Sequence, residues 1–166
     1  MSGYNVILVC DSSDRGVWTR DYGTHRIANE IRNIGYSCLV INFCSELSFE
    51  DWKTICELSI DDSTFLMGFS TSWWNAQPLF PLKIADNINK GGFVFDAMHG
   101  DISKWLSAPK HINSNIKFIM GGFNVGSFSS LPLDAFFDGF SETQIIDYIK
   151  DIKNNAGVLT KIVNHD

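Results

Sequence analysis

The sequence predicts an α/β fold: a doubly wound, five-stranded parallel sheet of order 2-1-3-4-5, Rossmann-like or flavodoxin-like. Segments typical of strands and helices alternate five times along the chain, which favours parallel strands joined by helical crossovers. The strand segments are continuous apolar runs, as expected for strands that are buried on both faces. Right-handed crossovers leave few strand orders, of which 2-1-3-4-5 is the commonest for five strands.

Five segments carry the strand pattern. The first reads NVILVC and begins almost at the amino terminus. A weaker pattern marks the last of the five, which contains a charged residue and a glycine. The five segments are residues 5–10, 38–43, 64–69, 116–120 and 135–140. No repeat, linker or low-complexity tract separates them, so we expect a single domain over residues 1–166.

Helical spacing of apolar residues appears between the strand segments. The first helix is expected to carry apolar residues from Ile27 to Ile34 and to end at Gly35. Ser48 and Asp51 form a capping-box pattern before the second helix. Further helices are expected at residues 82–88, at 102–106 within a less clear stretch of 93–115, and after a second capping-box pattern made by Ser141 and Gln144.

Composition excludes several classes of function. Hydrophobic residues make up 45% of the chain and charged residues 19%, which is typical of a globular protein. The net charge of −6 argues against nucleic acid or an anionic membrane as a partner. No apolar run approaches the roughly 18 residues of a membrane span, and the amino terminus lacks a cationic signal-peptide region. The four cysteines show no CxxC spacing, so we expect free buried thiols and a cytoplasmic protein.

Three loops are expected to meet at the carboxyl ends of strands one, three and four, where open α/β sheets bind ligands. The first contains Arg20 and Gly23 and leads into a helix start. The second carries three consecutive hydroxyl residues from Ser70 to Ser72, and the third begins with Gly121 and Gly122. Each segment also has an ordinary structural explanation, as a solvated loop, a set of caps or a plain turn.

Several familiar sites are absent. The first loop lacks GxxxxGK[ST], so a P-loop is excluded, and it also lacks the dinucleotide motif GxGxxG. A phospho-receiver would need a carboxylate after strand three and a lysine after strand five, where this chain has Ser70 and Gly139-Phe140. No GxSxG nucleophile elbow occurs.

Three stretches together resemble cobalamin-binding domains, especially those that precede radical S-adenosylmethionine catalytic domains. The first begins GTHRIA at Gly23 and continues to the VINF run that ends at Phe43. The second reads FLMGFSTS over residues 65–72. The third reads IMGG over residues 119–122 and is followed by DGFSE over residues 138–142. The resemblance covers most of residues 4–150 in order.

The resemblance implies a cobalamin that no protein histidine ligates. Members of the base-off type carry DxHxxG, SxL and GG after these three strands, and alignment on the glycine puts Arg20 at the histidine position and Trp18 at the aspartate position. His25 lies beyond that glycine, at the helix start. No catalytic or metal-binding residue is expected. The expected cofactor-binding residues are Arg20, Gly23, Thr24, His25, Ser70, Thr71, Ser72, Gly121, Gly122, Gly139 and Glu142.

The resemblance leaves the catalytic context open. Radical S-adenosylmethionine enzymes hold a four-iron cluster with CxxxCxxC, and this sequence has no such motif. We therefore expect a non-catalytic cofactor-binding module, either part of a longer enzyme or freestanding. One alternative is a protein-interaction module that has lost its cofactor, with Trp18, Trp73 and Trp74 as a contact patch. Another is a small enzyme that uses His25 with an aspartate, either Asp11 or Asp21, as an acid–base pair.

Overall fold

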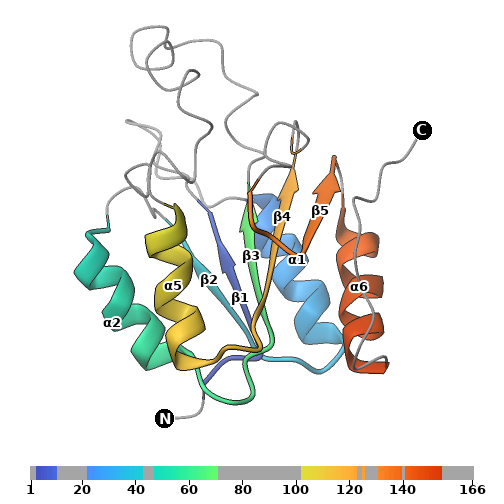
Figure 1. Ribbon diagram of the computed structural model, residues 1–166. Helices are drawn as coiled ribbons and strands as arrows, with labels where there is room; N and C mark the ends of the chain where they lie inside the picture. Colours follow the sequence, from blue (N-terminus) through green and yellow to red (C-terminus); the bar gives the residue numbers. More distant parts are fainter. Residues whose placement is uncertain are drawn as a thin grey trace, which may run out of the picture.

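Five parallel strands form one sheet in this computed structural model of the chain. The structure describes residues 3–10, 22–42, 47–70, 102–122, 125, 131–139 and 141–154. The strands lie in the order β2-β1-β3-β4-β5, and their carboxyl ends all point the same way (Figure 1). Their bounds are β1 Val6–Val9, β2 Cys38–Ile41, β3 Leu66–Ser70, β4 Lys117–Gly122 and β5 Ala135–Asp138. The predicted fold class and strand order are confirmed.

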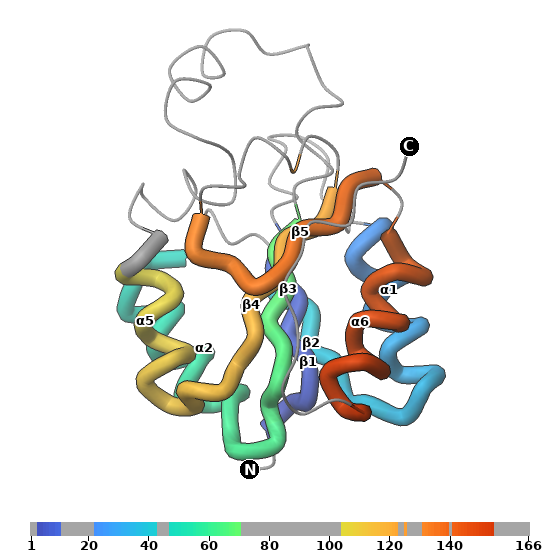
Figure 2. Tube along the Cα trace, turned by 45° about the vertical axis from the view of Figure 1, so that its right-hand side comes forward, coloured from blue at the N-terminus to red at the C-terminus, as the bar shows by residue number. Residues whose placement is uncertain are grey.

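Helices cover both faces of the sheet. On one face lie α1 (Tyr22–Asn33) and α6 (Glu142–Asn154). On the other lie α2 (Phe49–Ser59) and α5 (Ile102–Ile112). Figure 2 shows the two layers on either side of the strands. None of these described helices is both long and apolar enough to cross a membrane.

Alternating strand residues supply two separate hydrophobic cores. In β1, Val6 and Leu8 pack in the core beneath α1 and α6, whereas Ile7 and Val9 pack in the core beneath α2 and α5. All four side chains are at most 5% exposed. Because successive side chains of a strand point to opposite faces, an apolar run fills both cores at once. This explains why the strand segments show no alternation of polar and apolar residues.

The helix bounds differ from the sequence prediction in instructive ways. Helix α1 begins at Tyr22, ahead of the apolar positions that predict it, and is followed by Gly35 at a φ of +92°, which favours glycine. Helix α5 extends beyond residues 102–106 and includes Pro109. The helix expected at 82–88 lies outside the described residues.

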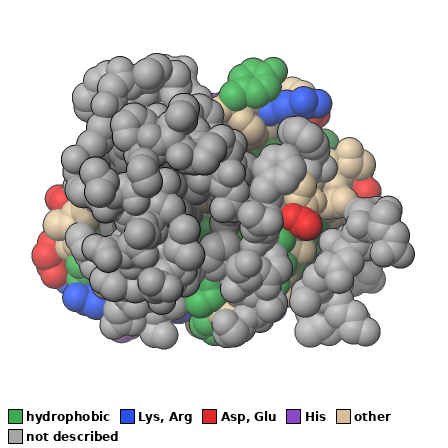
Figure 3. All heavy atoms as spheres, turned by 90° about the horizontal axis from the view of Figure 1, so that it is seen from above, with side chains coloured by type: hydrophobic (Ala, Val, Ile, Leu, Met, Phe, Trp, Pro, Cys, Tyr) green, Lys and Arg blue, Asp and Glu red, His purple; other side chains and the backbone are tan. Residues whose placement is uncertain are grey.

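The carboxyl edge of the sheet faces the viewer in Figure 3. Around its rim the described side chains include both acidic and basic ones, with hydrophobic side chains between them (Figure 3).

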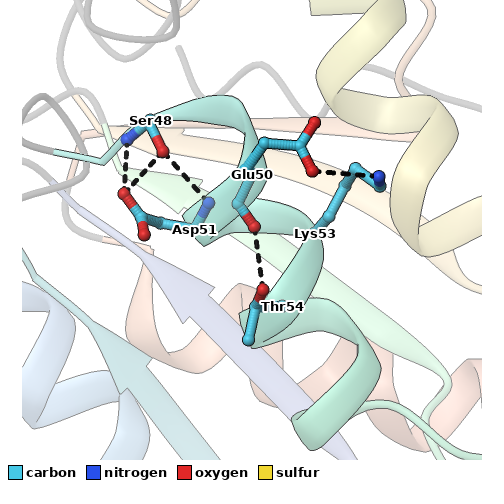
Figure 4. Close-up of polar contacts among 5 residues, drawn as sticks. All are labelled: Ser48, Glu50, Asp51, Lys53 and Thr54. Carbon is cyan, nitrogen blue, oxygen red and sulfur yellow. Dashed lines mark hydrogen bonds and ion pairs between the residues drawn. The ribbon is translucent and has the colours of Figure 1, made fainter.

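The capping box predicted for α2 is confirmed (Figure 4). The Asp51 backbone N–H donates to Ser48 Oγ at 3.1 Å, and the Ser48 backbone N–H donates to Asp51 Oδ2 at 3.0 Å. The Ser48 hydroxyl donates to the same carboxylate oxygen at 2.6 Å. These bonds, with the hydroxyl bond contributing most, lower the pKa of Asp51 below its ordinary value of 3.8. The charged carboxylate is thus favoured by folding.

We expect the stabilising effect of Asp51 to depend on pH. Because the folded-state pKa lies below 3.8, the contribution is complete above that pH and is lost as the pH falls through the lower folded value. Asp51→Ala should therefore lower the melting temperature at pH 7 and converge with the unaltered protein near pH 2, as measured by thermal unfolding. Glu57→Gln, an exposed change in the same helix, is the control; an Asp51→Ala effect that is independent of pH would contradict this explanation.

A tryptophan pair joins α2 to α5. Trp52 and Trp105 are both almost fully buried, and their ring centroids lie 5.6 Å apart. The indole N–H of Trp52 donates to the backbone carbonyl of Trp105 at 2.9 Å. This bond satisfies the one polar atom of a large buried side chain.

Trp52→Phe should keep most of the ring packing but remove this donor. The Trp105 carbonyl would then lose a partner in a buried position, so we expect a destabilisation of about 1–3 kcal/mol. Urea unfolding of the two proteins measures the difference. A decrease of less than about 0.5 kcal/mol in the unfolding free energy would show that the hydrogen bond contributes little to stability.

Candidate functional site

A pocket lies between the carboxyl half of the sheet and the first turns of α1 and α6. Its cavity volume is about 90 Å³ and its lining is predominantly apolar. Strands β1, β3 and β4 form one wall, and the two helices form the other. The lining residues are Leu8, Gly23, Thr24, Ile27, Gly68, Phe69, Ser70, Ile119, Gly121, Gly122, Gly139, Ser141, Glu142 and Ile145.

Glycines in two strands create the floor of the pocket. Leu8, Gly68 and Ile119 lie side by side in register across β1, β3 and β4. A Cβ atom on Gly68 would lie 2.9 Å from Leu8 Cδ2 and 3.3 Å from Ile119 Cγ1, so the neighbouring side chains have closed in over this glycine. One row further toward the carboxyl edge, Ser70 is paired with Gly121. The missing side chain at Gly121 leaves room above the sheet.

Two helix starts form the opposite wall. Gly23, Thr24 and Ile27 come from α1, and Ser141 with Glu142 comes from the start of α6. An ion pair joins the helices, with Arg26 Nε 3.5 Å from Glu142 Oε1. The Arg26 side chain is 57% exposed, so this pair contributes little to stability. Its geometry nevertheless places a carboxylate at the pocket wall.

The capping box expected from Ser141 and Gln144 at the start of α6 is not formed, so this prediction is wrong. The Ile145 backbone N–H donates to the Ser141 carbonyl at 2.9 Å, which is an ordinary first helical bond. Gln144, however, does not complete the box: its Oε1 atom is buried without a hydrogen-bond partner. The Ser141 hydroxyl lies instead on the pocket, 3.4 Å from the position a Cβ atom would occupy on Gly121. Residue Ser141 as a whole is only 3% exposed.

His25 belongs to a separate hydrogen-bonded cluster. Its Nε2 atom lies 3.2 Å from Asn42 Nδ2, and the Cys10 thiol donates to Asn42 Oδ1 at 2.8 Å. Since the side-chain oxygen of Asn42 accepts from Cys10, its amide nitrogen is the atom that faces His25. Within the described residues no aspartate contacts His25. Asp11 and Asp21, the expected acid–base partners, lie outside them.

The structure brings most of the expected site residues together. Seven of them line the pocket: Gly23, Thr24, Ser70, Gly121, Gly122, Gly139 and Glu142. His25 does not line it and is held by Asn42. Arg20, Thr71 and Ser72 lie outside the described residues, as do the three tryptophans of the possible contact patch, Trp18, Trp73 and Trp74.

Sequence reasoning missed the floor of the pocket and its buried hydroxyl. Gly68 carries a readable signal, since a glycine inside a buried strand marks a place where something approaches the backbone closely. The sequence context of Ser141 matches a helix cap, so it gives no signal for a place on the pocket. Leu8, Ile27, Ile119 and Ile145 match ordinary core positions, and no sequence signal distinguishes a pocket wall from a core residue.

No metal centre appears in the described part of the chain. There, no three or more side chains of His, Cys, Asp or Glu gather in a way that would hold an ion. Cys10, Cys38 and Cys56 are buried and take part in no disulfide, as expected. Burial raises the pKa of Cys38 and of Cys56 to about 12, so both thiols stay protonated at neutral pH.

Comparison of the chain with protein-family models, with curated proteins and with solved structures gave no match.

Replacement by alanine should change the unfolding free energy by different amounts at the two glycines of the pocket floor, Gly68 and Gly121. Gly121 lies outside the positive-φ region, and its added Cβ would make ordinary contacts, so Gly121→Ala should change the unfolding free energy by less than about 1 kcal/mol. Gly68→Ala would press on Leu8 and Ile119 and should destabilise by about 1–3 kcal/mol. Urea unfolding of both variants checks this, and equal effects would show that the floor is less tightly packed than described.

Proposed function

We propose that this chain is a cobalamin-binding module that holds the corrinoid at the carboxyl edge of its sheet without a histidine ligand to cobalt. The observation that carries the proposal is the glycine-floored pocket between the sheet and the starts of α1 and α6. It lies where the loops after strands one, three and four were expected to meet. The sequence resemblance to cobalamin-binding domains supplies the identity of the ligand.

The size of the pocket decides which part of cobalamin enters it. A cavity of about 90 Å³ is smaller than the roughly 150 Å³ that encloses a benzene molecule. A corrin macrocycle is therefore too large to be enclosed, and so is the two-ring base of cobalamin, which is larger than benzene. Only an edge of the corrinoid would reach the apolar walls made by Leu8, Ile119 and Ile145. The corrin ring would then lie outside, against the edge of the sheet.

The residues of this chain would act by binding and positioning. Gly121 and Gly122 let a flat ring approach the backbone of β4, and Gly23 does the same at the start of α1. Thr24, Ser141 and Glu142 add polar side chains to the lining at the starts of the two helices. His25 is oriented by Asn42 and does not line the pocket. These features support a cofactor held by shape and hydrogen bonds.

A partner would have to supply the chemistry. The resemblance is to modules that accompany radical S-adenosylmethionine domains, and those domains need three cysteines in CxxxCxxC spacing. The cysteines of this sequence do not have that spacing. We therefore propose that the catalytic group acts from another domain or subunit, with this module presenting the corrinoid to it.

Binding of hydroxocobalamin tests the proposal. We expect the corrinoid to co-elute with the protein in gel filtration, and we expect His25→Ala to leave the absorption spectrum of the bound corrinoid unchanged. Gly121→Val would fill the pocket and should weaken binding about tenfold or more, as measured by absorbance titration.

Two controls separate binding from stability. Ser107→Ala lies on α5, on the opposite helix layer, and should bind as the unaltered protein does. Far-ultraviolet circular dichroism and the melting temperature establish that Gly121→Val is folded, and Gly121→Ala gives an intermediate filling of the pocket. Absence of co-elution would refute cobalamin binding, and a spectrum that changes with His25→Ala would refute the unligated mode.

A further inference from the structure

We infer that Glu142 selects the group that enters the pocket by accepting a hydrogen bond from the N–H of a primary amide. The edge of a corrin ring carries side chains that end in such amides, each attached to a methylene group. The inference rests on the proposed corrinoid-binding function and names its specificity-determining residue. It predicts that the module prefers amide side chains over esters of similar size and shape.

The first observation is the size of the pocket. A cavity of roughly 150 Å³ encloses benzene, a molecule of six carbon atoms. In the same proportion, the pocket of about 90 Å³ has room for about four non-hydrogen atoms. A methylene group and the terminal amide attached to it match that number. The end of one corrin side chain therefore fits a space that is too small for a ring.

The second observation is the contrast between the apolar walls and a single carboxylate. Leu8, Ile119 and Ile145 line the pocket with aliphatic carbon, which suits a methylene group. Among the described lining residues Glu142 alone is charged, and its side chain is only 19% exposed. A ligand that suits both parts of this lining has a short apolar stem and an end that donates a hydrogen bond.

The third observation is the state of that carboxylate. Arg26 Nε lies 3.5 Å from Glu142 Oε1, and in the part of the chain that the structure describes the carboxylate has no other polar partner. An ionised carboxylate accepts hydrogen bonds at both oxygens, so capacity is left for a ligand. Because Arg26 already balances the negative charge and would repel a second cation, a neutral N–H donor suits the site better than an ammonium group.

The fourth observation is that a donor lies beside this acceptor. Ser141 directly precedes Glu142, and both residues line the pocket. The serine hydroxyl donates or accepts, whereas an ionised glutamate only accepts. The two residues together thus provide the donor and the acceptor that the oxygen and the N–H of a primary amide require. A methyl ester has no N–H, so it leaves Glu142 without its bond.

Two corrinoids that differ in their side chains test the inference. Dicyanocobinamide carries amide side chains, whereas the heptamethyl ester of dicyanocobyrinic acid carries methyl esters on the same ring, and neither has a lower base. We expect the unaltered protein to bind the amide corrinoid about tenfold more tightly, by equilibrium dialysis with detection of corrin absorbance. Glu142→Leu should remove most of that preference by weakening the binding of the amide corrinoid alone. Glu142→Gln keeps an acceptor oxygen and should retain part of the preference.

The matched control is Asp147→Leu. Asp147 also belongs to α6, but its side chain is 64% exposed and does not line the pocket. This variant should keep the full preference for the amide corrinoid. Far-ultraviolet circular dichroism and the melting temperature establish that each variant is folded. If Glu142→Leu does not fold, the unaltered protein and Glu142→Gln still decide the question, because a preference unchanged in Glu142→Gln would contradict selection by a charged acceptor.

The outcomes separate this inference from the proposed function. Equal binding of the two corrinoids to the unaltered protein would show that no amide is selected, and a preference that survives Glu142→Leu would show that another residue selects it. Equal weakening of both corrinoids by Glu142→Leu would also contradict the inference. Corrinoid binding still stands in these cases. If hydroxocobalamin binds but dicyanocobinamide does not, only this inference fails, and if no corrinoid binds, both proposals fail.

Discussion

Parallel pairing of the five strands is the constraint on which the rest of this structure depends. Each crossover returns the chain to the same end of the sheet, so all strands finish at one edge and the helices divide between two faces. Residues as distant in sequence as Leu8, Gly68 and Ile119 thereby lie in one row. The pocket exists because of the residues in this row and in the next row toward the carboxyl edge, where Ser70 pairs with Gly121. With a larger side chain in place of Gly121, the same edge would be filled like an ordinary core.

The two faces of the sheet serve different purposes. Beneath α2 and α5, Trp52 and Trp105 pack together with a satisfied indole N–H, and the capping box of Ser48 and Asp51 fixes the start of α2. Beneath α1 and α6, the core is equally apolar toward the amino ends of the strands but is hollowed toward their carboxyl ends. Among the described residues, the side of α2 and α5 thus joins two helices through a tryptophan pair, whereas the side of α1 and α6 contains the pocket.

The sequence predicts this fold well because its signals are local and agree with one another. Apolar runs predict the strands, and Ser48 with Asp51 predicts the start of α2, since each depends only on nearby residues. The pocket depends on register, which brings Gly68 between Leu8 and Ile119, and a single sequence does not specify how strands align. The same limit applies to His25, whose described contact is Asn42, the residue directly after β2. Local sequence patterns therefore predict the helices and strands more reliably than they predict the contacts between them.

Ser141 matches the sequence pattern of a helix cap but has a different position in the structure. A serine followed three residues later by glutamine satisfies the capping-box pattern, and capping would use both side chains at the start of α6. In the structure Gln144 Oε1 has no partner, and the serine hydroxyl lies beside Gly121 on the pocket. A missing serine cap costs the start of a helix about 0.5–2 kcal/mol, so a match to the capping pattern does not by itself show that the two side chains bond to the helix start. The pattern is local, whereas the places of these two side chains depend on how α6 packs against β4 and β5.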